Sequence, residues 1–198
     1  MNTPQFSPQW DWFKHVQPVF EKYLLPLAKT PPVDGLEIGC LEGRSTCWLL
    51  ENVCCHRPSS IWSVDPFKQM PDGPLAGVDM QQVGKTFREN IQMFRAKEIG
   101  YHDLFTMSSR DFYRQGFDLD YSFDFAFIDG SHAAPDVLCD AVGCYDRVRP
   151  DGLLIFDDYL WDLGDGVKRA VDAFLSIYSP EKVEVIEKGY VVVCRKVA

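Results

Sequence analysis

Residues 35–45 read Gly-Leu-Glu-Ile-Gly-Cys-Leu-Glu-Gly-Arg-Ser: an apolar run, a turn with two glycines, and the polar start of a helix. Gly39 and Gly43 tolerate the backbone conformations of a tight turn, and without a side chain they let a ligand approach the main chain. The N–H groups at the start of the following helix favour an anion such as a carboxylate, and Ser45 adds a hydroxyl group. This stretch therefore predicts a strand–turn–helix unit that binds a nucleoside-like ligand.

The spacing of this turn differs from that of a dinucleotide site. A dinucleotide fingerprint has the spacing GxGxxG, whereas Glu37, Gly39 and Gly43 give ExGxxxG. An acidic residue inside the turn, Glu42, would also repel a pyrophosphate. Asp65 follows the second expected strand, where an acidic side chain accepts hydrogen bonds from ribose hydroxyls. The remaining structural alternative is a plain turn between a strand and a capped helix.

Hydrophobic periodicity along the chain alternates between strands and helices. Strands are expected at residues 34–38, 61–64, 104–107, 123–128 and 153–156, and a closing hairpin at residues 182–186 and 190–195. Helices are expected in an N-terminal segment broken near Pro18, after Gly43, and at residues 80–94, 134–145 and 167–175. Residues 67–79 hold several prolines and glycines and are expected to form a loop that covers a site.

This order of elements predicts an α/β fold. We expect a Rossmann-like, doubly wound, mainly parallel sheet with helices on both faces and a C-terminal antiparallel hairpin. A chain of 198 residues is long enough for one domain with a full hydrophobic core. Residues 1–33 are interpreted as an N-terminal helical segment and residues 34–198 as the ligand-binding domain of a single globular unit.

Composition argues against several classes of protein. The formal net charge of −9 disfavours a nucleic-acid partner, which needs a cationic surface. No run approaches the roughly 18 apolar residues of a membrane span, and residues 1–12 lack the features of a signal peptide, so a cytoplasmic protein is expected. The seven cysteines form no CxxC pair, and those at positions 40, 47, 54 and 55 are expected to be apolar fillers rather than metal ligands.

Three carboxylates follow neighbouring strands of the expected sheet. Asp129 ends the fourth strand, and Asp157 and Asp158 end the fifth. Adjacent strands lie about 5 Å apart, so these side chains should meet at the edge where such folds bind ligands. No Lys or Arg in either segment offsets their charge, and oxygen ligands suit Mg²⁺, Mn²⁺ or Ca²⁺. The alternative is structural, with these aspartates capping local turns.

The glycine turn and Asp65 together resemble motif I of the class I S-adenosylmethionine-dependent methyltransferases, and the order of elements extends the resemblance over nearly the whole chain. The resemblance implies that Asp65 binds ribose and that Glu37 lies near the methionine amino group. Residues 108–111, Ser-Ser-Arg-Asp, resemble the stretch that contacts adenine in catechol O-methyltransferase. Ser109 and Arg110 are therefore candidate adenine contacts, although a serine there also suits a helix N-cap.

The carboxylates extend the resemblance to the divalent-cation-dependent small-molecule O-methyltransferases. In that group one Asp follows the fourth strand and an Asp-Asn or Asp-Asp pair follows the fifth, positions matched by Asp129, Asp157 and Asp158. The resemblance implies a metal site, with Mg²⁺ as the expected ion. The run Ile-Asp-Gly-Ser-His at residues 128–132 is also similar to macrolide-sugar O-methyltransferases and cephalosporin-hydroxylase-like proteins.

His132 is the sharpest candidate for a catalytic base, because an imidazole titrates near neutrality. It stands where catechol O-methyltransferase carries a lysine, so its role stays open, and Asp129 is the second candidate. The expected reaction transfers a methyl group from S-adenosylmethionine to the hydroxyl of a small molecule, with a metal lowering the pKa of that hydroxyl. The identity of the acceptor (a phenol, a catechol or a sugar) is not readable from the sequence.

Three other functions compete with this hypothesis. A methyltransferase-like scaffold would bind the cofactor without turnover, an NAD(P)-dependent oxidoreductase would need the missing GxGxxG, and an iron hydroxylase would need two histidines and a carboxylate. Among the remaining histidines, His15, His56 and His102 are expected to be surface or capping residues. The acceptor pocket could be walled by aromatic side chains or by the loop at residues 67–79; the aromatic candidates are Trp10, Trp12, Phe13, Tyr159 and Trp161. The N-terminal aromatic residues would also allow a homodimer.

Overall fold

The structure, a computed structural model, describes residues 3–69, 73–95, 100–115 and 122–197. Its strands are β1 (Asp34–Ile38), β2 (Ser60–Val64), β3 (Tyr101–Phe105), β4 (Phe123–Ile128), β5 (Val148–Phe156), β6 (Val183–Lys188) and β7 (Val192–Lys196). Its α-helices are α1 (Phe13–Tyr23), α2 (Arg44–Asn52), α3 (Met80–Arg95), α4 (Ser109–Arg114), α5 (Ala134–Arg147) and α6 (Gly166–Tyr178). Two short 3₁₀ helices, Pro8–Trp10 and Leu25–Lys29, flank α1.

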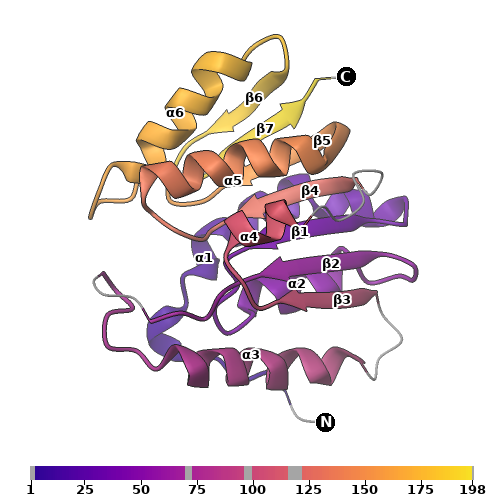
Figure 1. Cartoon of the computed structure of the whole chain (residues 1–198). Helices are drawn as coiled ribbons and strands as arrows, with labels where there is room; N and C mark the ends of the chain where they lie inside the picture. The colour runs from indigo at the N-terminus through magenta and orange to yellow at the C-terminus, as the bar shows by residue number, and fades with distance from the viewer. Residues whose placement is uncertain (1–2, 70–72, 96–99, 116–121, 198) are drawn as a thin grey trace.

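The strands form one twisted sheet with the order β3-β2-β1-β4-β5-β7-β6 (Figure 1). The pairs from β3 to β5 are parallel, and β7 pairs antiparallel with both β5 and β6. Going outward from β1, the chain first adds β2 and β3 on one side and then β4 and β5 on the other. The direction of winding therefore reverses between β1 and β4, and a crevice at such a reversal is where open α/β sheets bind ligands.

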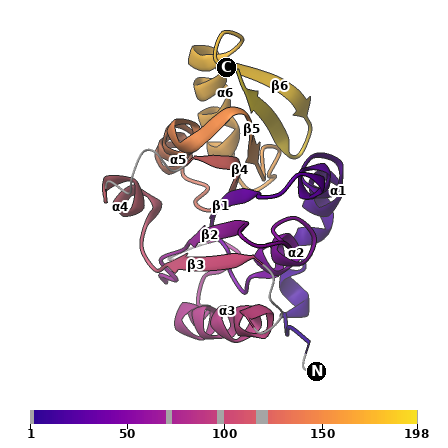
Figure 2. The same cartoon turned by 90° about the vertical axis from the view of Figure 1, so that its right-hand side faces the viewer.

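Two apolar layers cover the sheet, one on each face. Side chains of α1, α2 and α3 share one core with Phe125 and Phe127 of β4, and those of α4, α5 and α6 share the other with Ala126 and Ile128. Successive residues of β4 thus point to opposite faces, as strand geometry requires. Figure 2 shows α1 and α2 on one side of the sheet and α4 and α5 on the other. The expected doubly wound fold with a C-terminal hairpin is confirmed.

Three details of the expected elements are wrong. One is the start of β5, which begins at Val148 rather than residue 153 because Val148 pairs with Phe123 of β4. The helix α1 continues through Pro18, because Val16, Val19 and Phe20 bury its apolar face, and the Phe20 ring packs edge-on against Phe127 at 4.8 Å. Strand β3 begins at Tyr101 rather than residue 104, because Tyr101 pairs with Ser60 and the strand runs parallel to β2 from that point. The buried thiols of Cys40, Cys47 and Cys54 confirm that these residues fill the core. Among the described residues, no helix is both long and apolar enough to cross a membrane.

One buried acid on α5 affects the stability of the fold. Asp140 is 2 % exposed, and its Oδ1 atom has no hydrogen-bond partner among the described residues. Burial raises the pKa of Asp140 from 3.8 to about 6 against opposing hydrogen bonds from Ser109 and Tyr113. The folded chain favours the protonated, neutral form of Asp140. Its contribution to the free energy of unfolding is therefore fully present below about pH 4 and is lost as the pH rises through about 6.

We expect Asp140→Asn to increase the free energy of unfolding by about 1–3 kcal/mol above pH 7, because the amide removes the cost of a buried charge. The gain should vanish near pH 3, where Asp140 is protonated in both states. Urea unfolding of both proteins at the two pH values measures the difference. Asp146→Asn, a change of an exposed acid on the same helix, is the matched control and should be neutral. Equal stability of Asp140→Asn and the unsubstituted chain above pH 7 would contradict the account.

Candidate active site

The candidate site lies at the carboxyl ends of β1, β2, β4 and β5, where backbone hydrogen bonds hold the strand ends together. The Gly39 N–H donates to Val64 O at 2.9 Å, and the Asp129 N–H donates to Ile38 O at 2.8 Å. The Asp157 N–H donates to Ile128 O at 3.1 Å. The turn after β1 and the aspartates after β4 and β5 are therefore parts of one rigid edge.

The glycines of the turn are required by conformation and by packing. Gly39 and Gly43 have φ of 82° and 81°, a region that favours glycine. A Cβ at Gly39 would lie 2.1 Å from the carbonyl oxygen of Asp129, and one at Gly43 would lie 2.8 Å from the Phe87 ring. Both positions are thus explained by close contacts within the protein, and Gly39 brings the turn directly against Asp129.

Asp65 binds this turn from the end of β2. Its Oδ2 atom accepts hydrogen bonds from the N–H groups of Cys40 and Leu41 at 3.0 and 3.2 Å, and its Oδ1 atom accepts one from Phe67 at 2.7 Å. Leu41 itself has a φ of 46°, so the turn needs such an anchor. The carboxylate lies where a ribose ligand is predicted, and it also fixes the shape of the turn.

Glu37 is fully buried beneath the turn. Its carboxylate accepts hydrogen bonds from the hydroxyls of Ser45, Thr46 and Ser63 at 2.5, 2.5 and 2.7 Å. Burial raises the pKa of Glu37, although these three donors oppose the shift. Ser45 therefore ties the start of α2 to β1, which supports the turn from below. Its predicted contact with a cofactor stays a prediction.

The N-terminal segment closes over the other side of the turn. The backbone N–H and the hydroxyl of Ser7 donate to the Glu42 carboxylate at 2.6 and 2.8 Å. The guanidinium of Arg44 lies over the Phe6 ring at 4.4 Å. Glu42, the acidic residue that would repel a pyrophosphate, therefore anchors the N-terminal segment.

The predicted adenine contacts lie at the start of α4. Ser108 is the N-cap of this helix, since its hydroxyl accepts the Asp111 N–H at 3.2 Å. Arg110 is half-exposed and pairs with Asp136 of α5 at 2.8 Å. The N-cap is thus confirmed, one residue before Ser109. The adenine roles of Ser109 and Arg110 stay predictions.

Two histidines meet the predicted carboxylates. The Nε2 atom of His15, on α1, lies 2.8 and 3.0 Å from the two carboxylate oxygens of Asp157. The Nε2 atom of His132 lies 3.0 Å from Asp158 Oδ2. His15 is exposed, as expected of a surface residue. The expectation missed its contact with Asp157, which arises because α1 packs beside the sheet and carries this side chain to the end of β5. The sequence offered no motif for it, since 142 residues separate the pair.

The potential ligand atoms form two overlapping sets. One set is His15, Asp157 and Asp158, the other is Asp129, His132 and Asp158, and the atoms of each lie within 4.8 Å of one another. The three aspartates together are not one of these sets among the described residues, and the metal site expected from them stays a prediction. Each set has one imidazole and two carboxylates, which is not the two-histidine set of an iron hydroxylase.

The pKa values of the three carboxylates are shifted differently. Asp129 is exposed by surface area, and loss of solvation together with the charges of Asp157 and Asp158 raises its pKa well above the usual range. Burial raises the pKa of Asp157 despite the hydrogen bond from His15. Burial would also raise the pKa of Asp158, but hydrogen bonds from His132 and Tyr190 outweigh it and leave that pKa lowered. Asp158 is thus the best anion and Asp129 the best proton acceptor of the group.

Aromatic side chains complete the site. The Tyr190 hydroxyl, from the turn between β6 and β7, donates to Asp158 Oδ1 at 2.8 Å. The Trp161 ring packs edge-on against His132, with centroids 4.1 Å apart. Tyr159, in contrast, is buried and donates to Asp172 at 2.9 Å, and Phe13 packs on Phe20 in the core. Of the proposed aromatic walls, Trp161 is the one in contact with a predicted catalytic residue, and Tyr190 was not predicted.

His132 and the three aspartates line a small recess that opens to solvent. It is lined by Ile128, Asp129, Gly130, Ser131, His132, Val137, Phe156, Asp157, Asp158 and Val167. The recess therefore joins the Asp129–His132 segment to the Asp157–Asp158 pair, as the sequence predicts for two neighbouring strand ends.

Comparisons with known proteins agree with this geometry. Residues 36–159 match a family described as a methyltransferase domain, and no curated protein matches the chain. A proposed O-methyltransferase from Klebsiella pneumoniae has a TM-score of 0.65 at 16% identity, covering 100% of this chain and 84% of its own. The O-methyltransferase TomG from Streptomyces achromogenes, in complex with S-adenosylmethionine, has a TM-score of 0.65 at 13% identity, covering 91% and 80%.

A third similar structure has another substrate in its name. A proposed rRNA methylase from Clostridium thermocellum has a TM-score of 0.69 at 11% identity, covering 92% of this chain and 96% of its own. At such low identities, the structural likenesses establish the fold rather than the acceptor. The family match spans most of the chain and includes the turn, Asp65, Asp129 and the Asp157–Asp158 pair. The chain belongs to the methyltransferase-domain family and has the fold of the class I S-adenosylmethionine-dependent enzymes.

Proposed function

We propose that this protein transfers a methyl group from S-adenosylmethionine to a hydroxyl oxygen of a small molecule, with the help of a divalent cation. The observation that carries the proposal is the position of Asp129. Its main chain touches the glycine turn at Gly39, and its carboxylate shares a ligand set with His132 and Asp158. Asp129 therefore connects the turn expected to hold the methyl donor with the side chains expected to accept the proton.

The residues at the ends of β1 and β2 fit the methyl donor. The turn after β1 has its glycines in the left-handed region, and the Asp65 carboxylate binds two N–H groups of that turn. A nucleoside with a cationic sulfur suits a site whose nearby acids outnumber its bases. Glu37 and Ser45 act as positioning residues here, because their side chains bond each other beneath the turn.

The donor set at the ends of β4 and β5 fits a divalent cation. Carboxylates supply charge, and imidazole is a common ligand for the later divalent metals. When bound, the methyl donor supplies an electrophilic carbon, and the cation supplies positive charge that lowers the pKa of a nearby hydroxyl. Asp157 and Asp158 would hold the cation, with Asp158 the more readily ionised.

Asp129 and His132 would hold the proton that the acceptor loses. As the new oxygen–carbon bond forms and the sulfur–carbon bond breaks, the hydroxyl proton passes to one of these two side chains. Asp158 and Trp161 hold the His132 ring by contacts at 3.0 and 4.1 Å, so its orientation is fixed. Alignment of donor and acceptor by such rigid groups supplies much of the rate increase of a bimolecular reaction.

The proposal predicts the class of acceptor. EDTA-treated protein is supplied with methyl-labelled S-adenosylmethionine and a panel of catechols, phenols and sugars, with and without added Mg²⁺ or Mn²⁺. We expect label on a hydroxyl oxygen, with turnover stimulated by a metal. Total RNA is the competing acceptor, and the net charge of −9 predicts no transfer to it. Transfer to RNA or to nitrogen would contradict the proposal, and cofactor binding without turnover of any acceptor would favour a scaffold.

A further inference from the structure

The first observation is that His15 reaches the Asp157–Asp158 pair from a rigid element. Its neighbours Val16, Val19 and Phe20 are buried in the core beside the sheet. The His15 ring is about a third exposed and meets the Tyr190 ring edge-on at 4.9 Å. A surface histidine with no function would not need a helix anchored in the core to hold its ring against Tyr190. Here the fold directs a nitrogen atom at the Asp157 carboxylate, which follows a strand far away in the sequence.

The second observation is the spacing of the potential ligand atoms. The distances from His15 Nε2 to the Asp157 oxygens are 2.8 and 3.0 Å. Ligands at right angles around an ion with bonds of 2.0–2.1 Å stand about 2.9 Å apart, whereas those around Ca²⁺ stand farther apart. The His15–Asp157 distances thus fit both a hydrogen bond and joint ligation of a small divalent cation, and the ligand atoms of His15, Asp157 and Asp158 all lie within 4.8 Å of one another.

The third observation is that the oxygen ligands are already oriented. Asp157 Oδ1 accepts the Asp158 N–H at 2.8 Å, and the Tyr190 hydroxyl holds Asp158 Oδ1. Hydrogen bonds of this kind fix the ligands of a metal site and strengthen binding. In the described part of the chain, the ion pairs of both carboxylates are with histidines rather than with Lys or Arg.

We propose that His15 is a nitrogen ligand of the cation held by Asp157 and Asp158, so that the site selects a first-row transition metal such as Mn²⁺, Fe²⁺, Co²⁺ or Zn²⁺ over Mg²⁺. Imidazole binds these ions much more strongly than it binds Mg²⁺, which prefers oxygen and water. The inference rests on the metal-assisted transfer proposed above and replaces the Mg²⁺ expected from the sequence. In this arrangement, His132 and Asp129 remain free of the cation and can accept the proton of the acceptor hydroxyl.

The test compares CoCl₂ with MgCl₂ on EDTA-treated protein in the absence of substrate. Calorimetry gives the two affinities, and the visible absorption of bound Co²⁺ reports its nitrogen and oxygen ligands. We expect Co²⁺ to bind at least about tenfold more tightly than Mg²⁺. His15→Ala should weaken Co²⁺ binding by about 10–100-fold and shift its absorption, with little effect on the affinity for Mg²⁺. His56→Ala, a change of an exposed histidine in the loop after α2, should change neither.

Thermal unfolding of each variant checks that it is folded, and His15→Gln serves in place of His15→Ala if the latter is not. The alternative is that a protonated His15 simply neutralises Asp157 as an ion pair. Equal affinity for Co²⁺ and Mg²⁺, no metal binding at all, or unchanged Co²⁺ binding in the His15 variants would overturn the inference. Titration of S-adenosylmethionine into the same samples separates the two proposals. Cofactor binding and methyl transfer that persist without a metal would refute the His15 ligand while leaving the methyltransferase in place.

Discussion

Asp65→Ala is expected to lower the affinity for S-adenosylmethionine by about 100-fold, which corresponds to about 2.7 kcal/mol. Two losses combine in this variant. The N–H groups of Cys40, Leu41 and Phe67 lose the carboxylate that they share, so the glycine turn loses its anchor. The predicted acceptor of the ribose hydroxyls is lost too, and a hydrogen bond to a charged group contributes about 1.5–3 kcal/mol. Calorimetric titration measures the effect.

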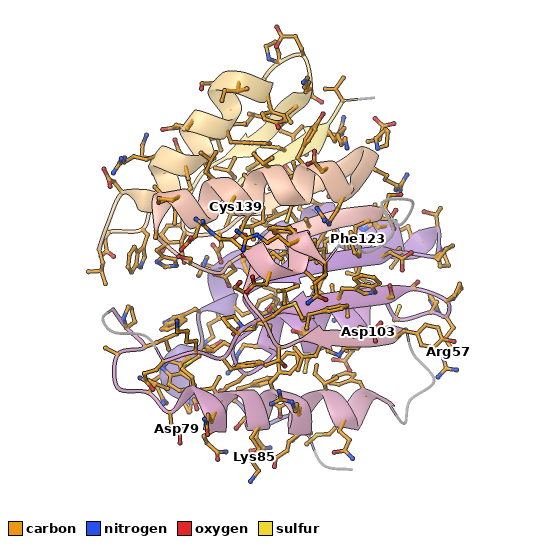
Figure 3. All side chains as sticks on the ribbon, in the orientation of Figure 1. Arg57, Asp79, Lys85, Asp103, Phe123 and Cys139 are labelled. Carbon is orange, nitrogen blue, oxygen red and sulfur yellow. The ribbon has the colours of Figure 1, made fainter. Side chains whose placement is uncertain are left out.

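Asp103→Ala is the matched control. Asp103 is an exposed acid in the middle of β3 (Figure 3), where it pairs with Trp62 of β2 rather than with the strand end that carries Asp65. The variant removes the same charge and should bind the cofactor as the unsubstituted chain does. If Asp65→Ala and Asp103→Ala bind equally well, Asp65 has no part in the cofactor site. If both variants lose binding, net charge rather than the Asp65 contacts controls affinity.

Asp129→Asn is expected to reduce kcat by about 10²–10⁴, the range for loss of a general base, with unchanged affinity for S-adenosylmethionine. The amide keeps the size of the side chain and the backbone contact with Gly39, but it cannot accept the acceptor's proton. The raised pKa of Asp129, caused by loss of solvation and by the neighbouring carboxylates, makes it a better base than an ordinary aspartate. Turnover of an acceptor found in the screen measures kcat.

His132→Asn tests the other candidate base in the same assay. The variant with the larger loss of kcat identifies the group that takes the proton, since each substitution leaves the other group in place. Both variants should retain the cofactor titration of the unsubstituted chain. Full turnover by both would contradict a proton transfer at this edge of the sheet, and loss of cofactor binding in Asp129→Asn would mean that the substitution disturbs the turn.

Much of the fold could be predicted because its decisive signals are local. The apolar runs at β1 and β4 have the bounds predicted from periodicity, and the glycines before α2 adopt the positive φ that a tight turn needs. The early start of β3 could not be read in this way, since pairing with Ser60 of β2 sets its first residue. Pairing between strands depends on distant residues, and a pattern within one segment does not contain it.

The site was predicted where a motif marks it and missed where the fold supplies the residue. Asp129 and the Asp157–Asp158 pair end adjacent strands, so their proximity follows from the strand order. His15 and Tyr190 come from α1 and the final hairpin, and each reaches the aspartates through packing of a whole element. Because no Lys or Arg lies nearby in the sequence, a bound metal ion was the one group expected to offset the negative charge of the aspartates. In the structure, the imidazoles of His15 and His132 also pair with these aspartates.

The central claim is that the glycine turn and Asp65 form a site for S-adenosylmethionine. Calorimetric titration of S-adenosylmethionine into the unsubstituted chain, with NAD titrated in parallel, tests it most directly. The account predicts one cofactor bound per chain with a Kd in the range of about 1–100 μM, a binding free energy of about −5 to −8 kcal/mol, and no heat from NAD. Absence of S-adenosylmethionine binding by folded protein, or preferential binding of NAD, would contradict it.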